Sequence, residues 1–176
     1  MRAPQCTIDS SCVIALDHLG FLPYLSLLFS QVLLPKAVRE DLFKRRSTKN
    51  RVQAIFESLA FFKRCDDYDK GAVDFLLAER EREGSRDRGE VEAVVQASKF
   101  GATVIVDDAW GRELAARDDL QYHGTFWVLQ RFYEFGLYSS ADCRRNFVSL
   151  RNRGIRLPWT EVNAFLKSIK ELPIEP

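Results

Sequence analysis

The sequence predicts an α/β fold with a mostly parallel sheet. Residues 102–106 are small or β-favouring, run into the carboxylate pair Asp107 and Asp108, and are followed by a helical segment. Residues 5–8 show the same order, because a short apolar strand ends on Asp9 and serines then open a helix. In open α/β sheets ligands bind at the carboxyl ends of the strands, so these acids mark a candidate site.

Further strands and helices follow along the chain. The remaining strands are expected at 31–34, 60–63 and 120–123. The helices are expected at 10–19, 21–29, 36–43, 47–59, 68–81, 89–98, 109–117, 126–136, 139–151 and 159–170. The charged run at 79–88 mixes both signs around Gly-Ser and is expected to be a solvated loop.

Length and cysteine usage suit one ordinary domain in a reducing compartment. A chain of 176 residues can bury a core without disulfides. Its four cysteines form no CxxC pair, which argues against a zinc site and favours unpaired thiols of the cytosol. No signal peptide and no bilayer-spanning apolar run is recognised, so we expect a cytoplasmic protein that does not contact a membrane.

The charges are unevenly distributed although the net charge is only +1. Lys44, Arg45 and Arg46 form one basic cluster, and Arg144 and Arg145 belong to another. A basic rim around an acidic centre suits a polyanionic substrate that is handled through metal ions. The alternative, which is common for charge runs on helices, is a solvated surface without a ligand.

Asp9 and Asp107 are the first candidates for a shared site. If their strands are parallel neighbours, which lie about 4.8 Å apart, both carboxylates reach the same edge of the sheet and one cation. The alternative for Asp9 is that it merely caps the helix that follows it. Oxygen ligands without histidine or cysteine select Mg²⁺ or Mn²⁺.

Two glutamates on helices, Glu40 and Glu92, are further candidates, whereas Glu90 has a structural explanation. Glu40 lies beside a buried stripe and could face the acidic edge, but helical spacing slightly favours a pair with Lys36 or Lys44. Glu90 and Glu92 are two residues apart and point in nearly opposite directions. Glu90 in the first helical turn suits the positive helix terminus, whereas Glu92 flanks a buried face and needs a partner or an ion.

Taken together, these pieces resemble the PIN-domain nucleases, in particular the compact prokaryotic kind related to toxins of toxin/antitoxin pairs. The resemblance covers residues 6 to about 137. The matching pieces are Ile8-Asp9-Ser10-Ser11 with Ile14 and Leu16, Pro35-x-x-Val38-x-Glu40-x-Leu42, Gly89-Glu90-x-Glu92-Ala93, Val104-Ile105-Val106-Asp107-Asp108-x-x-Gly111-Arg112, and Gly124-Thr125-x-x-Val128-Leu129.

The resemblance implies a three-layer α/β/α sandwich with C-terminal helices added. It divides the chain into a PIN-like nuclease domain, 1–138, and a helical extension, 139–176, packed on the same domain. The implied catalytic residues are Asp9, Glu40, Glu92, Asp107 and, as a close fifth, Asp108. Three of these, Asp9, Glu92 and Asp107, are the implied metal ligands, with Glu92 as a longer substitute for the family's frequent aspartate.

The function implied by the resemblance is a toxin-like endoribonuclease that uses Mg²⁺ or Mn²⁺ to activate water for attack on phosphorus. Single-stranded or structured RNA is the implied substrate, and a small antitoxin protein and a second copy of the chain are the implied partners. The residues expected to contact RNA are Lys44, Arg45, Arg46, Arg112, Arg144 and Arg145.

Two other classes of protein remain open from the sequence. A catalytically silent domain that binds RNA or protein would share the fold, but the intact set of acids disfavours it. A receiver-type phosphoacceptor module also has acids at strand ends. Its acidic pair should follow the first strand, whereas here the single Asp9 comes first and the pair comes late.

Overall fold

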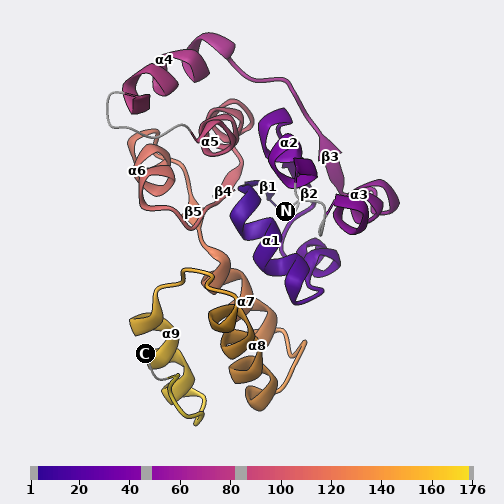
Figure 1. The fold of residues 1–176 in the computed structure, drawn as a ribbon, viewed down its shortest axis with the longest axis vertical. Helices are drawn as coiled ribbons and strands as arrows, with labels where there is room; N and C mark the ends of the chain where they lie inside the picture. Colours follow the sequence, from indigo (N-terminus) through magenta and orange to yellow (C-terminus); the bar gives the residue numbers. More distant parts are fainter. Residues whose placement is uncertain (1–3, 45–48, 82–86, 175–176) are drawn as a thin grey trace. The chain divides into compact units, whose positions relative to one another are not determined.

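The computed structural model describes residues 4–44, 49–81 and 87–174. The chain forms two compact units, residues 1–122 and 123–176, which we describe separately (Figure 1). The boundary between these units precedes the domain boundary expected after residue 138. That expected boundary stays a prediction about how the chain is organised.

The first unit is built on a sheet whose strand order is β3-β2-β1-β4-β5. The pairs β1–β2, β1–β4 and β2–β3 are parallel, which confirms the predicted mostly parallel sheet and the α/β/α class. The strands are β1 Gln5–Ile8, β2 Gln31–Leu34, β3 Phe62–Arg64, β4 Thr103–Ile105 and β5 Tyr122–His123. The central strands β1 and β4 are almost completely buried because helices cover the sheet, and this explains their continuous apolar sequences.

Helix α5 is the main packing partner of the central strands. It lies against β1 and β4 and also contacts α2, α4 and α6 (Figure 1). Its buried face includes Val91, Val94 and Ala97, which pack against the sheet residues Val104 and Leu33. The helices of this unit are α1 Ser10–His18, the 3₁₀-helix η1 Leu22–Leu27, α2 Lys36–Lys44, α3 Lys49–Ser58, α4 Lys70–Glu81, α5 Arg88–Phe100 and α6 Ala109–Arg117.

Two predicted elements differ from the structure. The segment expected as an α-helix over 21–29 is the shorter 3₁₀-helix η1, because Pro23 removes a donor in its first turn and the chain must extend again at Gln31. The strand expected at 60–63 lies at 62–64, because its register with β2 pairs Phe62 with Val32 and a turn holds the two residues before it.

The second unit is helical. Its core is formed by apolar side chains such as Val128, Phe132, Phe147 and Leu166, all fully buried. The three helices predicted for this stretch are confirmed as α7 Thr125–Glu134, α8 Ser140–Asn152 and α9 Trp159–Ser168. Across the described parts of both units, no helix is long and apolar enough to cross a membrane.

Candidate functional site

The sheet has its topological switch point between β1 and β4. The chain builds outward from β1 to β2 and β3, and then returns to the other side of β1 with β4. Loops leave in opposite directions at such a point, so a crevice forms at the carboxyl ends of the two strands. Asp9 follows β1, and Asp107 follows β4 after Val106. The backbone N–H of Asp9 donates to the Ile105 carbonyl at 2.9 Å, so Asp9 and Asp107 lie at the same edge of the sheet.

The carboxylate of Asp9 is buried, with only 2% of the residue exposed. Its Oδ2 atom caps α1 by accepting from the Ser11 backbone N–H at 2.9 Å and from the Ser11 hydroxyl. Its Oδ1 atom is buried and accepts no hydrogen bond from any described residue. Burial raises the pKa of Asp9, and the negative charge of Asp87 adds to that rise. Capping therefore accounts for one oxygen of Asp9 and leaves the other available.

Asp107 lies in a more polar setting. Its Oδ2 accepts from the buried Cys12 thiol at 3.4 Å, and its Oδ1 lies 3.7 Å from the Arg112 guanidinium. Arg112 is itself held by a hydrogen bond of 3.2 Å to the Val106 carbonyl. The neighbouring Asp108 is exposed and caps α6 through the Trp110 backbone N–H at 2.8 Å. Of the adjacent pair, Asp107 is therefore the one that belongs to the crevice.

Glu90 joins this edge from the first turn of α5, although its position in the sequence suggests only a partner for the positive helix terminus. It is 95% buried, and a Cβ built on Gly111 would lie 3.7 Å from its Cδ and Oε2 atoms. Gly111 is in the first turn of α6, so Glu90 lies beside the segment that carries Asp107. A signal was available, because Glu90 shares a helical stripe with the buried Val94 and Ala97.

On α2 the structure separates Glu40 from its neighbour Asp41. The Glu40 side chain is 55% exposed and pairs with Lys36 at 3.7 Å, which confirms the helical pair favoured by spacing. Asp41 instead faces the start of α5, because its Oδ2 would lie 3.3 Å from a Cβ on Gly89. Asp87 Oδ1 would lie 3.4 Å from the same point. The catalytic role of Glu40 stays a prediction, and Asp41 is the better placed acid.

Glu92 is fully engaged by protein donors. Its Oε2 accepts from the Ala37 backbone N–H at 2.8 Å, and its Oε1 accepts from Arg88 Nε at 2.7 Å. The Tyr68 hydroxyl is a third partner. The pKa of Tyr68 is raised to about 12, mainly by burial and next by its hydrogen bond to Glu92. The partner that a buried carboxylate requires is therefore supplied by the protein.

The predicted RNA-contacting residues are placed only in part. Lys44 is exposed and pairs with Asp41 at 3.1 Å, whereas Arg45 and Arg46 lie outside the described residues. In the second unit, Arg144 donates to the Leu172 carbonyl at 2.9 Å, and the exposed Arg145 pairs with Asp142. Their roles in nucleic-acid binding stay predictions.

The oxygen ligands at this edge suit Mg²⁺ or Mn²⁺, because they are carboxylate oxygens and one of them is buried without a partner among the described residues. Within the described residues, no three His, Cys, Asp or Glu side chains already come close enough together to enclose a metal ion. A closed cage is not what Mg²⁺ requires, since it commonly binds one or two carboxylates and keeps several waters. The residues present therefore fit such an ion at Asp9 and Asp107.

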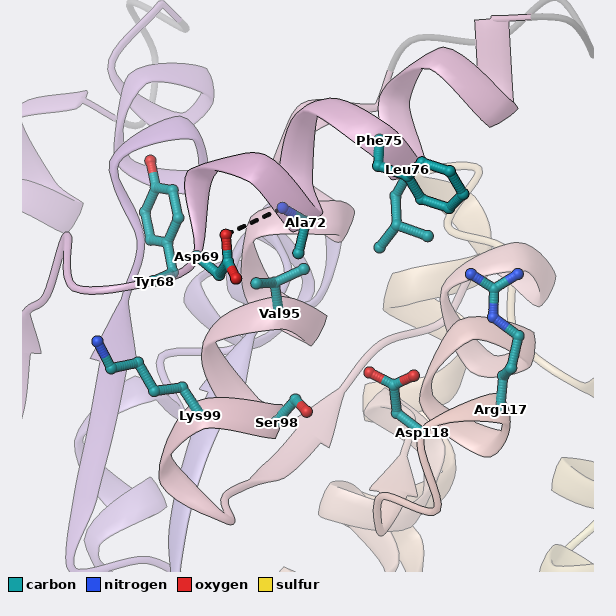
Figure 2. A pocket seen from close by; sticks show the side chains of 10 residues that line it. All are labelled: Tyr68, Asp69, Ala72, Phe75, Leu76, Val95, Ser98, Lys99, Arg117 and Asp118. Carbon is teal, nitrogen blue, oxygen red and sulfur yellow. Dashed lines mark hydrogen bonds between the residues drawn. The ribbon is translucent and has the colours of Figure 1, made fainter.

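A pocket of about 680 Å³ lies elsewhere in the first unit, between α4, α5 and α6 (Figure 2). It is lined by Tyr68, Asp69, Ala72, Phe75, Leu76, Val95, Ser98, Lys99, Arg117 and Asp118. The lining residues from α5 and α6 lie at the C-terminal ends of these helices, whereas Glu90 and Asp107 lie at their N-terminal ends. The pocket is therefore separate from the acidic edge, and we assign it no chemistry.

The comparisons with known proteins agree with the fold. A family model described as a PIN domain matches residues 5–171, which includes the C-terminal helices that lay outside the resemblance. No curated protein matches the chain. The match spans nearly the whole sequence, and the resemblance drawn from the motifs is confirmed. The chain belongs to the PIN-domain family and has the fold of a nuclease.

Proposed function

We propose that this protein is a metal-dependent endoribonuclease of the toxin-like kind. The observation that carries the proposal is the buried Oδ1 of Asp9, which has no hydrogen-bond partner among the described residues at the switch point of the sheet. A buried carboxylate oxygen without a partner is costly, and a bound cation removes that cost. The family supports a nuclease, and the resemblance to toxin-related members supports RNA as the substrate.

In this proposal, Asp9 and Asp107 hold Mg²⁺ or Mn²⁺. The ion supplies Lewis-acid stabilisation of the phosphate and makes water more acidic. Glu90 and Asp41 would orient water or contribute a further oxygen, because the Glu90 carboxyl lies beside Gly111 of α6 and Asp41 faces the start of α5 at Gly89. Arg112, fixed by the Val106 carbonyl, would bring a guanidinium to a phosphate oxygen. Glu40, Glu92 and Asp108 have other contacts in the structure, so we give them no ligand role.

The proposed partners follow from the same assignment. The substrate would be single-stranded or structured RNA, approached through Arg112 and the predicted basic clusters. A small antitoxin protein would restrain the activity, and two copies of the chain would associate.

A second function is favoured by one observation. Since no three candidate ligands within the described residues are close enough to enclose a metal, the chain could be a silent PIN-like domain that binds RNA or protein without cleaving it. The two functions differ in one outcome, which is whether RNA is cut when Mg²⁺ or Mn²⁺ is present.

The test is cleavage of labelled single-stranded RNA and matched DNA, with Mg²⁺, with Mn²⁺ and with excess chelator. We expect RNA cleavage that requires the metal and is lost in Asp9→Asn. The matched control is Asp67→Asn, an exposed acid paired with Lys99, which should cleave like the original protein. RNA binding without cleavage in every metal condition would support the silent domain, and cleavage that persists in chelator would refute both.

A further inference from the structure

Glu92 is a buried charge that connects three separate segments of the first unit. Only 1% of the residue is exposed, yet its two oxygens reach Ala37 on α2, Arg88 on its own helix and Tyr68 before α4. Buried carboxylates with several charge-assisted donors are held in one geometry. The Glu92 side chain therefore fixes the position of one segment relative to another.

The contact with Ala37 supplies a cap that helix α2 lacks locally. The helix begins at Lys36, directly after Pro35, and proline has no side-chain oxygen that could accept from the first free N–H groups. Glu92 accepts from one of these groups although it lies 55 residues away in sequence. Its negative charge also lies at the positive end of the α2 dipole.

The faces of α2 and α5 that meet here carry Asp41 and Glu92. Ala37 and Asp41 are four residues apart and lie on one face of α2, while Gly89 and Glu92 are three apart on the opposing face of α5. A Cβ on Gly89 would lie 3.6 Å from Val38 Cγ2 and 3.3 Å from Asp41 Oδ2. The two helices therefore approach closely at Gly89, about one turn from the Glu92 contact.

We propose that Glu92 is a positioning residue that caps α2 and so holds Asp41 beside Asp87 at the start of α5, and that it does not bind the metal. The part that concerns Asp41 in catalysis rests on the proposed nuclease function. The capping part stands on the contacts of Glu92 alone.

The first experiment measures amide hydrogen exchange by NMR in the metal-free protein, with Glu57→Gln as control. Glu57 is an exposed glutamate that pairs with Arg64, so its change removes an ion pair without touching α2. In Glu92→Gln we expect the Ala37 amide to exchange about tenfold faster, since the charge-assisted acceptor is lost. Unchanged exchange at Ala37 would overturn the proposal. If Glu92→Gln does not fold, Arg88→Gln serves instead. Arg88 is half exposed, and without its ion pair the Glu92 side chain is held less firmly, so exchange at Ala37 should again be faster.

The second experiment separates positioning from metal binding. Mn²⁺ affinity, measured by electron paramagnetic resonance, should fall about tenfold or more in Asp9→Asn and stay within about threefold of the original in Glu92→Gln. Equal loss in both variants would make Glu92 a ligand and overturn the proposal. In cleavage assays, Glu92→Gln should lower kcat in the original background and add little in an Asp41→Asn background. A protein that neither binds Mn²⁺ nor cuts RNA would refute the proposed function, while exchange at Ala37 would still decide the capping role.

Discussion

Helices α5 and α6 have two ends that differ in how their charges are satisfied. At the N-terminal ends, Glu90 is buried and Asp107 is partly buried. Asp9 follows the adjacent strand β1, is buried, and has one oxygen without a partner among the described residues. At the C-terminal ends, which line the pocket of Figure 2, Lys99 pairs with Asp67 and Arg117 pairs with Glu79. Buried and incompletely satisfied charge costs stability and indicates function, whereas exposed and paired charge indicates neither.

The largest effect should separate the two ends in activity. We expect Asp107→Asn to lower RNA cleavage by about 10² or more, because a ligand of the proposed metal is lost. Arg117→Gln at the opposite end should leave cleavage unchanged. Initial rates at saturating Mn²⁺ measure both, and full activity in Asp107→Asn would remove this residue from the site.

A smaller effect should come from the packing beside the acids. A Cβ on Gly111 would lie 2.6 Å from Val106 Cγ2, which belongs to a buried residue with little room to move. We expect Gly111→Ala to lower the free energy of unfolding by about 1–3 kcal/mol. Gly71→Ala is the matched control, because its Cβ would meet only the exposed Asp69 side chain at 3.3 Å. Urea denaturation measures the free energy of unfolding of both variants. If Gly111→Ala is as stable as Gly71→Ala, the start of α6 can shift to make space for the added methyl group.

The next effect depends on pH. Because burial raises the pKa of Asp9 in the folded state, protonated Asp9 favours folding at low pH, and this contribution is lost as the pH rises through the raised pKa. Because pH 7 lies above the ordinary pKa of an aspartate, the raised pKa of Asp9 lowers the stability of the metal-free protein at this pH. We expect Asp9→Asn to be more stable than the original by about 1 kcal/mol at pH 7, with the difference shrinking as the pH falls below that pKa. Melting curves of the original protein and Asp9→Asn, recorded at pH 7 and at a pH below the raised pKa, check this. A less stable Asp9→Asn at pH 7 would mean that the cap to Ser11 outweighs the buried charge.

The smallest effect is expected at the pocket end. Lys99 and Asp67 are both substantially exposed, so their ion pair is worth about 0–1 kcal/mol. Lys99→Gln should change the free energy of unfolding by less than about 0.5 kcal/mol. A decrease of about 2 kcal/mol or more in the free energy of unfolding, measured by urea denaturation, would show that the ion pairs at this end also contribute strongly to stability.

Much of the fold could be predicted because strand and helix patterns are local. The strands that carry Asp9 and Asp107 were predictable from short apolar runs that end on an acid, and the sheet order placed them as neighbours. The 3₁₀-helix η1 was not, because its apolar spacing resembles that of an α-helix and the difference depends on Pro23 and on where β2 must begin.

The helical acids were harder to predict because periodicity does not say which element faces a given side chain. Glu90 and Glu92 both lie on buried positions of α5, but the neighbours that distinguish them come from distant parts of the chain. Gly111 on α6 lies beside Glu90, while Ala37 on α2 donates to Glu92. Asp41 and Glu40 differ in the same way, since the close approach at Gly89 becomes visible only after α2 and α5 pack together.

The most direct test of the acidic edge is calorimetric titration of Mn²⁺ into the metal-free protein and into Asp9→Asn. We predict saturable binding to the original protein, weakened about tenfold or more in Asp9→Asn, with Asp67→Asn binding like the original. Equal Mn²⁺ affinity in the original protein and Asp9→Asn would contradict the account, because the buried Oδ1 of Asp9 would then have no part in holding the ion.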